Sequence, residues 1–195
     1  MTPKLLKTAY EENGSVLRLS VDVGERRPHV YRALLSHAPA LETLTEDTFL
    51  DEDALRTLEQ ENTYCDATAK ALRLLAGSDH SVRALTRKLC ERGVDREVAA
   101  TVAGEMRDLG YIREESQAAR LVVTRAHAKL WGPRRLIPDL VSKGYPPATV
   151  RAAILQAEEE GDLDFAAIRA RLLESKLDGQ ATAEDRKKLL YKHGF

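Results

Sequence analysis

Basic side chains gather in three short segments of the chain, and they are the residues that could bind an anionic partner. Lysine and arginine form charge-assisted hydrogen bonds with protein carboxylates and with the phosphates of nucleic acids. Because the three groups lie about fifty residues apart, we predict one basic stripe that repeats along the molecule. The candidate binding residues are Arg83, Arg87 and Lys88, then Lys129, Arg134, Arg135 and Lys143, then Arg186, Lys187, Lys188 and Lys192.

The alternative interpretation of this stripe is a set of solvated helix faces, which is what most charged clusters on helices are. Arg134 and Arg135 are the best single candidates, because free N–H groups at a predicted helix start also favour an anion. The single tryptophan, Trp131, is interpreted as a packing anchor, with a base-stacking platform as the alternative. His80, beside the corresponding helix start in the first segment, is expected at the surface.

Catalytic motifs and metal-ligand spacings do not occur in the sequence. Serine, histidine and aspartate are all present, but no G-x-S-x-G, H-E-x-x-H or P-loop pattern brings them together. The 5 histidines are scattered, and none has a partner at the spacing of a zinc or di-iron site. We therefore expect a protein that is not an enzyme, with no catalytic residues, no metal, no cofactor and no small-molecule substrate.

The composition is that of a soluble globular protein, with 43% hydrophobic residues and a net charge of −1. No uninterrupted apolar run is long enough for a membrane span, and the first residues do not form a signal peptide. Cys65 and Cys90 lack a C-x-x-C spacing and are expected to be small buried apolar residues in a reducing compartment. We expect a cytoplasmic monomer with no membrane partner.

The charge is divided unevenly along the chain. Residues 1–64 carry 7 basic and 12 acidic residues, and residues 65–195 carry 23 basic and 19 acidic residues. The excess of positive charge in the second part is too small for a protein held on DNA by phosphate neutralisation alone. It is compatible with a basic stripe along one face.

The elements that position the stripe are three similar stretches of sequence. Residues 81–94 match residues 132–145 at a shift of 51, and a further shift of 50 brings in the end of the chain. Each stretch begins with a residue favoured at a helix N-cap and ends with a glycine that can take the left-handed conformation. The starts are Ser81, Gly132 and Thr182, and the ends are Gly93, Gly144 and Gly194.

Further helices are predicted before and after these stretches, so the repeating unit has three helices. One follows each of the first two glycines and runs to Gly110 and Gly161, and others cover 66–75, 114–130 and 164–177. Pro138 lies inside a predicted helix and must kink it or shift its start. The predicted fold class is mainly α, a curved elongated solenoid of tandem repeats. The three-helix repeats are 65–110 and 111–161, and a truncated one is 162–195.

The first part of the chain has a different pattern. Hydrophobic and polar residues alternate over 17–23, which predicts a strand, and Asn13-Gly14 predicts a hairpin with residues 5–10. Residues 28–38 are ambiguous between strand and helix, and Asp51-Glu52-Asp53 caps a predicted helix. Residues 1–64 are therefore expected to form an acidic N-terminal element, a β-hairpin plus a helix, that docks on the first repeat.

In the order and spacing of these motifs, residues 65–195 resemble the RecX family of RecA regulators. The resemblance implies a regulatory protein of homologous recombination, DNA repair and the SOS response, a RecA modulator that binds the RecA filament on single-stranded DNA. It also implies that the protein limits filament growth, ATP hydrolysis and strand exchange. Many members have one more helix after the position of Phe195. The resemblance rests on Gly110-Tyr111-Ile112, Arg125, Gly132-Pro133-Arg134-Arg135-Leu136, Asp139-Leu140, Lys143-Gly144 and residues 189–195.

Two other functions remain open at this point. The helices could act as a DNA-binding array through phosphate contacts, or as a structural scaffold for an unrelated protein. A DNA-binding protein should lose affinity steeply with salt whether or not RecA is present. A filament modulator should instead depend on RecA-coated single strands and bind bare duplex DNA poorly.

Overall fold

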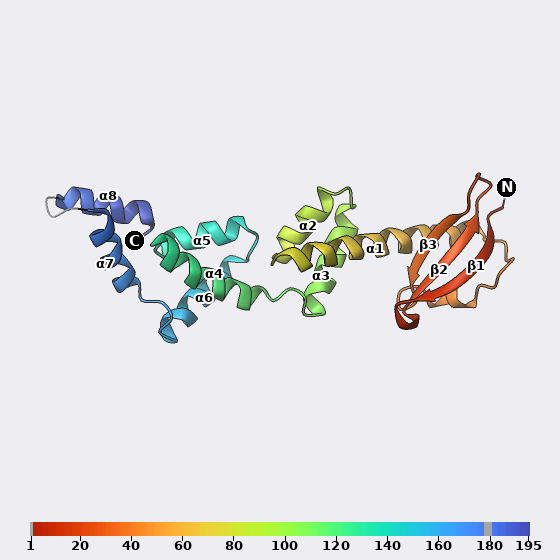
Figure 1. Ribbon diagram of the computed structural model, residues 1–195, viewed down its shortest axis with the longest axis horizontal. Helices are drawn as coiled ribbons and strands as arrows, with labels where there is room; N and C mark the ends of the chain where they lie inside the picture. Colours follow the sequence, from red (N-terminus) through yellow and green to blue (C-terminus); the bar gives the residue numbers. More distant parts are fainter. Residues whose placement is uncertain (1, 178–180) are drawn as a thin grey trace. The chain divides into compact units, whose positions relative to one another are not determined.

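The computed structural model describes residues 2–177 and 181–195, and this part of the chain is mainly helical with one small sheet (Figure 1). The predicted fold class, helices with a β element at the N-terminal end, is confirmed in that respect. The strands are β1 (Lys4–Glu11), β2 (Val16–Asp22) and β3 (His29–Leu34), and the helices are α1 (Glu52–Gly77), α2 (Val82–Cys90), α3 (Arg96–Asp108), α4 (Glu114–Lys129), α5 (Pro133–Ser142), α6 (Pro147–Glu159), α7 (Phe165–Lys176) and α8 (Ala183–His193).

The sheet is antiparallel, with the strand order β1-β2-β3. The predicted hairpin is confirmed, and a short 3-10 helix (Glu12–Gly14) connects its strands. The ambiguous segment forms the third strand, because Tyr31 and Ala33 alternate with exposed residues and lie in the same core as Leu19. An alternating burial pattern is what a strand with one covered face requires.

Helix α1 is one continuous helix where the sequence predicted two, so the expected boundary at residue 64 falls inside it. Asp51 begins the helix, since its Oδ1 accepts a hydrogen bond from the Ala54 N–H (2.8 Å). No glycine or proline interrupts the chain between residue 52 and Gly77, and nothing else there ends a helix. The division into repeats at 65–110, 111–161 and 162–195 stays a prediction.

The contacts divide the chain into two units, residues 1–74 with 89–102, and residues 75–88 with 103–195. In the first unit, the sheet packs on the first turns of α1, where Leu58 is fully buried with Leu5 and Leu19. A hydrogen bond from the Arg32 N–H to Asn62 Oδ1 (3.0 Å) adds a polar contact. The sheet therefore gains the packing surface that an isolated hairpin lacks.

The second unit has its own core between α4, α5 and α6. Leu136 and Leu140 on α5 are completely buried there, together with Val122 of α4 and Ile154 of α6. Helix α5 begins at Pro133 and continues through Pro138, so the second proline does not shift the start of the helix. No helix in the described ranges is long and apolar enough to cross a membrane.

The two cysteines are free thiols that are partly exposed, so the expectation that both are buried is wrong. Cys65 lies on α1, and burial together with the nearby Glu61 carboxylate raises the pKa of its thiol to about 11. That environment makes Cys65 a poor nucleophile at neutral pH.

Candidate functional site

The three helices α2, α5 and α8, called here the middle helices, begin and end in the same way. Ser81 caps α2 by accepting the Ala84 N–H at Oγ (3.1 Å), and Thr182 forms a capping box with Asp185 at the start of α8. Gly93, Gly144 and Gly194 follow the three helices with φ values of +78°, +96° and +87°. The predicted caps are confirmed at these positions.

The end of α5 lies directly against the start of α2, and this contact is called the first junction. The Ser81 hydroxyl donates a hydrogen bond to the carbonyl of Lys143 (2.9 Å). A Cβ placed on Gly144 would lie 2.5 Å from Ser81 Oγ, so only glycine fits there. The Val82 N–H, a first-turn amide of α2, donates to Glu114 Oε1 (2.9 Å).

The end of α8 lies against the start of α5 in the same manner and forms the second junction. The Gly132 N–H donates to the carbonyl of His193 (2.8 Å), and the Arg134 N–H donates to the carbonyl of Gly194 (3.1 Å). A Cβ on Gly132 would lie 2.5 Å from the Gly194 oxygen. Figure 1 shows the C-terminus beside the start of α5.

These junctions explain how the helix ends are satisfied. At the second junction, carbonyl groups at the end of α8 accept N–H groups at the start of α5, and at the first junction the Lys143 carbonyl at the end of α5 accepts the Ser81 hydroxyl at the start of α2. The negative end of one helix dipole thereby lies beside the positive end of another. The expectation that the first amides of α5 are available for an anion is therefore wrong. The Arg134 N–H donates to the Gly194 carbonyl, and the Arg135 N–H donates to the Gly132 carbonyl (3.1 Å).

A basic hollow of about 320 Å³ lies beside the first junction. Arg87, Lys88, Arg125 and Lys143 line it against the single carboxylate of Asp79, which gives a formal charge of +3. It is lined by residues from α2, from α4 and from the end of α5. Such a concentration of positive charge favours an anionic partner.

His80 lies in the wall of this hollow, and the expectation that it is at the surface is wrong. Its side chain is buried, with 7% exposed. Its Nε2 lies 3.2 Å from the hydroxyl of Ser78 and 3.3 Å from Nζ of Lys88. The imidazole therefore helps to fix the position of a lysine that faces the hollow.

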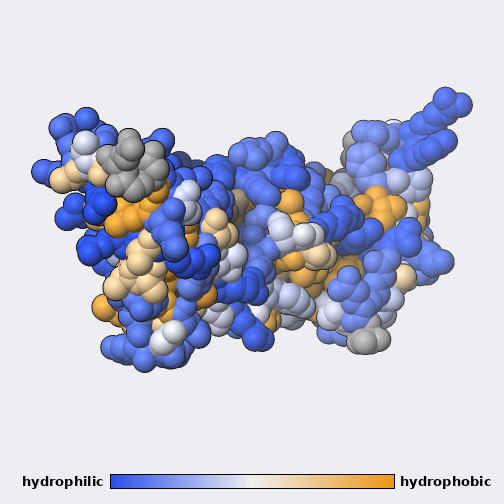
Figure 2. All heavy atoms as spheres, turned by 60° about the vertical axis from the view of Figure 1, so that its left-hand side comes forward, coloured by the Kyte–Doolittle hydropathy of each residue, from blue (hydrophilic) through white to orange (hydrophobic). Residues whose placement is uncertain are grey.

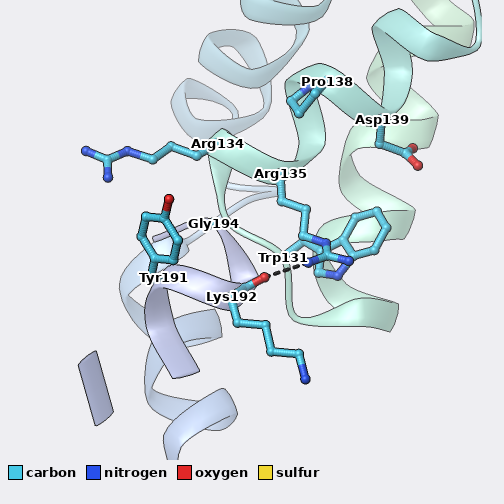
Figure 3. A pocket seen from close by; sticks show the side chains of 8 residues that line it. All are labelled: Trp131, Arg134, Arg135, Pro138, Asp139, Tyr191, Lys192 and Gly194. Carbon is cyan, nitrogen blue, oxygen red and sulfur yellow. Dashed lines mark hydrogen bonds between the residues drawn. The ribbon is translucent and has the colours of Figure 1, made fainter. Parts of the chain in front are cut away.

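A second hollow of about 580 Å³ lies beside the second junction (Figure 3). Arg134, Arg135 and Lys192 line it against the carboxylate of Asp139, a formal charge of +2. The Arg135 guanidinium donates to the carbonyl of Lys192 (2.6 Å). Figure 3 shows the Arg134 side chain pointing away from that hydrogen bond, on the side where Tyr191 lies.

Trp131 is partly buried against the core of the second unit, and two cations lie over its ring. The guanidinium carbon of Arg135 is 4.8 Å from the ring centroid, and Lys129 Nζ is 4.5 Å from it. Cation–π contacts of this kind hold a ring in place. These contacts favour the interpretation of Trp131 as a packing anchor.

The two hollows are lined in part by residues at equivalent positions of the sequence. Each lies where the first turns of a middle helix meet the glycine turn of the next middle helix. The sequence shift between them is the same 51 residues that relate the predicted repeats. Four pairs of lining residues correspond at this shift: His80 with Trp131, Ala84 with Arg135, Arg87 with Pro138, and Lys88 with Asp139.

The structure separates the predicted stripe into three groups. Arg87, Lys88 and Lys143 meet at the first hollow, and Arg83 is an exposed residue whose Cβ lies beside Gly144. At the second hollow, Lys129 lies over the Trp131 ring and Lys192 shares the wall with the predicted arginine pair. The third group lies on α8 at a separate groove with Arg134 and consists of Arg186, Lys187 and Lys188. Their role in binding stays a prediction.

Two features of the hollows were missed from the sequence. Arg125 on α4 forms a partly buried ion pair with Asp139 on α5, and these residues line different hollows. Arg125 and Asp139 were singled out in the sequence only as part of the family pattern, and their pairing was not predicted because no periodicity within one helix connects them. The ring of Tyr191 is 78% exposed in the second hollow, and the sequence singled it out only as part of the family pattern over residues 189–195.

The capping box of α8 gives a titration that can be measured. Hydrogen bonds from the Thr182 hydroxyl and N–H lower the pKa of the Asp185 carboxyl. The depressed pKa stabilises the cap above the unfolded value of Asp185, and this contribution is lost as pH falls through the folded value. Thr182→Ala should raise the pKa of Asp185 towards its ordinary value, as followed by carboxyl-carbon NMR. An unchanged titration would contradict the role of Thr182.

Comparison with known proteins gives the same result from sequence and from structure. The family model described as "RecX, first three-helix domain" matches residues 67–106. "Regulatory protein RecX" of Stenotrophomonas maltophilia (strain K279a) is 33% identical over 132 residues, which cover 65% of this chain and 77% of that protein. A protein of the same name from Thermus thermophilus is 36% identical over 95 residues, or 49% of this chain and 65% of its own length.

Two solved structures share the fold. A "Crystal structure of regulatory protein RecX" superposes with a TM-score of 0.75 at 20% identity and covers 99% of this chain and 94% of that one. The structure of RecX from Lactobacillus salivarius gives 0.56 at 16% identity, over 68% of this chain and 88% of that one. Against the sequence relatives from Thermus thermophilus and Clostridioides difficile, the chain spans 65% of their length.

Proposed function

Because this chain belongs to the RecX family of regulatory proteins, we propose that it is a non-enzymatic regulator of the RecA filament on single-stranded DNA. In this proposal it acts in the cytoplasm and limits filament growth, ATP hydrolysis and strand exchange in homologous recombination and DNA repair. The basic hollows contact acidic groups of the filament protomers or the DNA that they hold.

The observation that carries the proposal is the presence of a basic hollow at each of two equivalent junctions. A filament presents the same surface again and again along its axis, so a binding protein gains from presenting its own contact more than once. The rigid hydrogen-bonded junctions fix the spacing of the two hollows within the second unit. Two weak contacts at a fixed spacing can together give specific binding.

The test reverses one charge in each hollow. Arg134 and Lys143 are exposed, and no ion pair in the described residues holds either side chain. The double variant Arg134→Glu with Lys143→Glu should need about tenfold more protein to inhibit the DNA-dependent ATPase of RecA, because each reversal repels an acidic partner. Arg135 is left unchanged, since its guanidinium holds the Lys192 carbonyl.

A matched control is Arg151→Glu on α6, an exposed cation that lines neither hollow. It should inhibit as well as the parent, and circular dichroism should show equal helical content for all the proteins. Full inhibition by the double variant would remove the hollows from the proposal. A folded parent that leaves RecA activity unchanged would overturn the proposal itself.

A second candidate function is direct binding of single-stranded DNA. It is favoured by the exposed ring of Tyr191 beside Arg134 and Lys192, since an aromatic ring next to cations can stack a base and hold its phosphate. This function requires affinity for an oligo(dT) without RecA and a steep loss of that affinity with salt. Fluorescence anisotropy at several salt concentrations distinguishes the two functions.

A further inference from the structure

A groove of about 780 Å³ lies along α8 and reaches one residue of α7. Leu190, Tyr191 and Phe195 give it an apolar surface, and Arg169 and Arg186 are among the cations at its sides. Helices α7 and α8 pack on each other as α4 and α5 do, and α6 packs on both α4 and α5.

The position of the groove corresponds to the surface that α6 covers in the preceding repeat. A shift of 50 residues relates the N-caps Gly132 and Thr182 and also the glycines that end the two helices. The α5 residues at the equivalent positions are buried in the core that α6 completes, whereas α8 has no buried residue. At this shift Leu136 corresponds to Arg186, Leu140 to Leu190, and Tyr145 to Phe195.

Two exchanges of residue type make this surface basic. At the shift of 50 residues, Arg186 stands where α5 has the fully buried Leu136, and Arg169 on α7 stands where α4 has the partly buried Ala119. Both arginines are exposed, and no ion pair joins either of them to a carboxylate within residues 2–177 and 181–195. The surface therefore keeps the apolar residues of a helix-packing site and adds positive charge to it.

The apolar part of the surface is large for a position that faces solvent. Tyr191 is 78% exposed, and Leu190 and Phe195 are half-buried. Figure 2 shows orange and tan apolar surface at the end of the second unit that α7 and α8 form, bordered by hydrophilic residues. A contiguous apolar patch with a polar rim is typical of an interaction site.

We propose that this groove binds an acidic amphipathic helix of a partner protein. The apolar face of that helix covers Leu190 and Phe195 as α6 covers Leu140 and Tyr145, and its carboxylates pair with Arg169 and Arg186. Helices that dock in grooves use apolar anchors at spacings of three and four residues, and Val150, Ala153, Ile154 and Ala157 of α6 follow this spacing. A nucleic acid would pair with the arginines but leave the apolar floor uncovered.

The probe is a synthetic helical peptide, about as long as α6, that carries the four apolar positions of α6 and glutamate at the flanking positions. A second peptide with lysine in place of each glutamate is the matched control. Fluorescence anisotropy of the labelled peptides with the protein of residues 1–195 should show binding of the acidic peptide and at least tenfold weaker binding of the basic one. Raising the salt concentration should narrow the difference, because screening weakens the ion pairs.

Three variants locate the site. Arg169→Glu with Arg186→Glu should weaken the acidic peptide at least tenfold, and Arg151→Glu on α6, outside the groove, should leave it unchanged. Arg186→Leu restores the residue type of α5, so it should keep the fold and improve binding of a third peptide with glutamine at the flanking positions. This last result does not depend on disrupting any part of the protein.

The proposal is overturned if the double variant binds the acidic peptide as well as the parent. It is also overturned if no peptide binds while a labelled oligo(dT) binds in a manner that requires Arg169 and Arg186, since the groove would then be a nucleic-acid site. RecA is absent from these measurements, so their outcome is independent of the ATPase test described above.

Discussion

Gly144→Ala should destabilise the protein by about 3 kcal/mol, although it adds only one methyl group. Gly144 has a φ of +96°, where a Cβ is strained, and the added carbon would lie 2.5 Å from Ser81 Oγ and 3.1 Å from Arg83 Cβ. The start of α2 must move away, and the hydrogen bond from Ser81 to the Lys143 carbonyl is lost. Urea unfolding measures the change in free energy.

Gly161→Ala is the matched control for this prediction. Gly161 has a φ of +81°, but a Cβ there would meet nothing within 4 Å. Its substitution should cost only the conformational strain, about 1 kcal/mol. The difference between the two variants isolates the close approach at the first junction. Equal losses would mean that the junction contributes nothing to stability.

Hydrogen exchange gives a local measurement of the same effect. The Ala84 N–H is bonded to the Ser81 hydroxyl, which the junction holds in place. In Gly144→Ala this amide should exchange faster than in the parent, whereas Gly161→Ala should leave it unchanged. A change confined to α6 in both variants would contradict the proposed contact between α5 and α2.

Leu140→Ala should destabilise the second unit by about 2–5 kcal/mol, because it removes a fully buried side chain and leaves a cavity between α4, α5 and α6. The equivalent change in the following predicted repeat, Leu190→Ala, should cost about 1 kcal/mol or less, since that side chain is already partly exposed and lies on a helix with no buried residue. Thermal or urea unfolding of the two variants provides the comparison.

This pair of substitutions also tests how the repeats differ. If Leu190→Ala costs as much as Leu140→Ala, then α8 is covered in solution as α5 is, and the groove is not free to bind a partner. A small cost at Leu190 together with a large one at Leu140 agrees with a third middle helix whose apolar side is left for another molecule.

The junctions connect stability with the proposed function. The same glycine turns that end α5 and α8 also supply the carbonyls that hold the start of the preceding middle helix. Any change that separates α5 from α8 moves Arg134 relative to Lys192 and so alters the second hollow. Variants at the glycines should therefore lose RecA regulation through their structure, whereas variants at exposed arginines should lose it with the fold intact.

The sequence by itself determined where the three middle helices begin and end. A helix start depends on one capping side chain, and its end depends on one residue able to take a positive φ. Ser81, Thr182 and Gly194 therefore indicated these helix boundaries from the local sequence alone. The hairpin was predictable for the same reason. The continuity of α1 was missed, because two separate helices were predicted although no glycine or proline lies between them.

Only the tertiary structure decided which groups the basic side chains contact. Arg134 and Arg135 are neighbours in the sequence, yet one points to solvent and the other holds the Lys192 carbonyl and lies over Trp131. Their helix start is closed by Gly194, which lies at the far end of the chain. Periodicity reports which face of a helix is covered, but the partner that covers it lies elsewhere in the chain and is fixed by packing between distant segments.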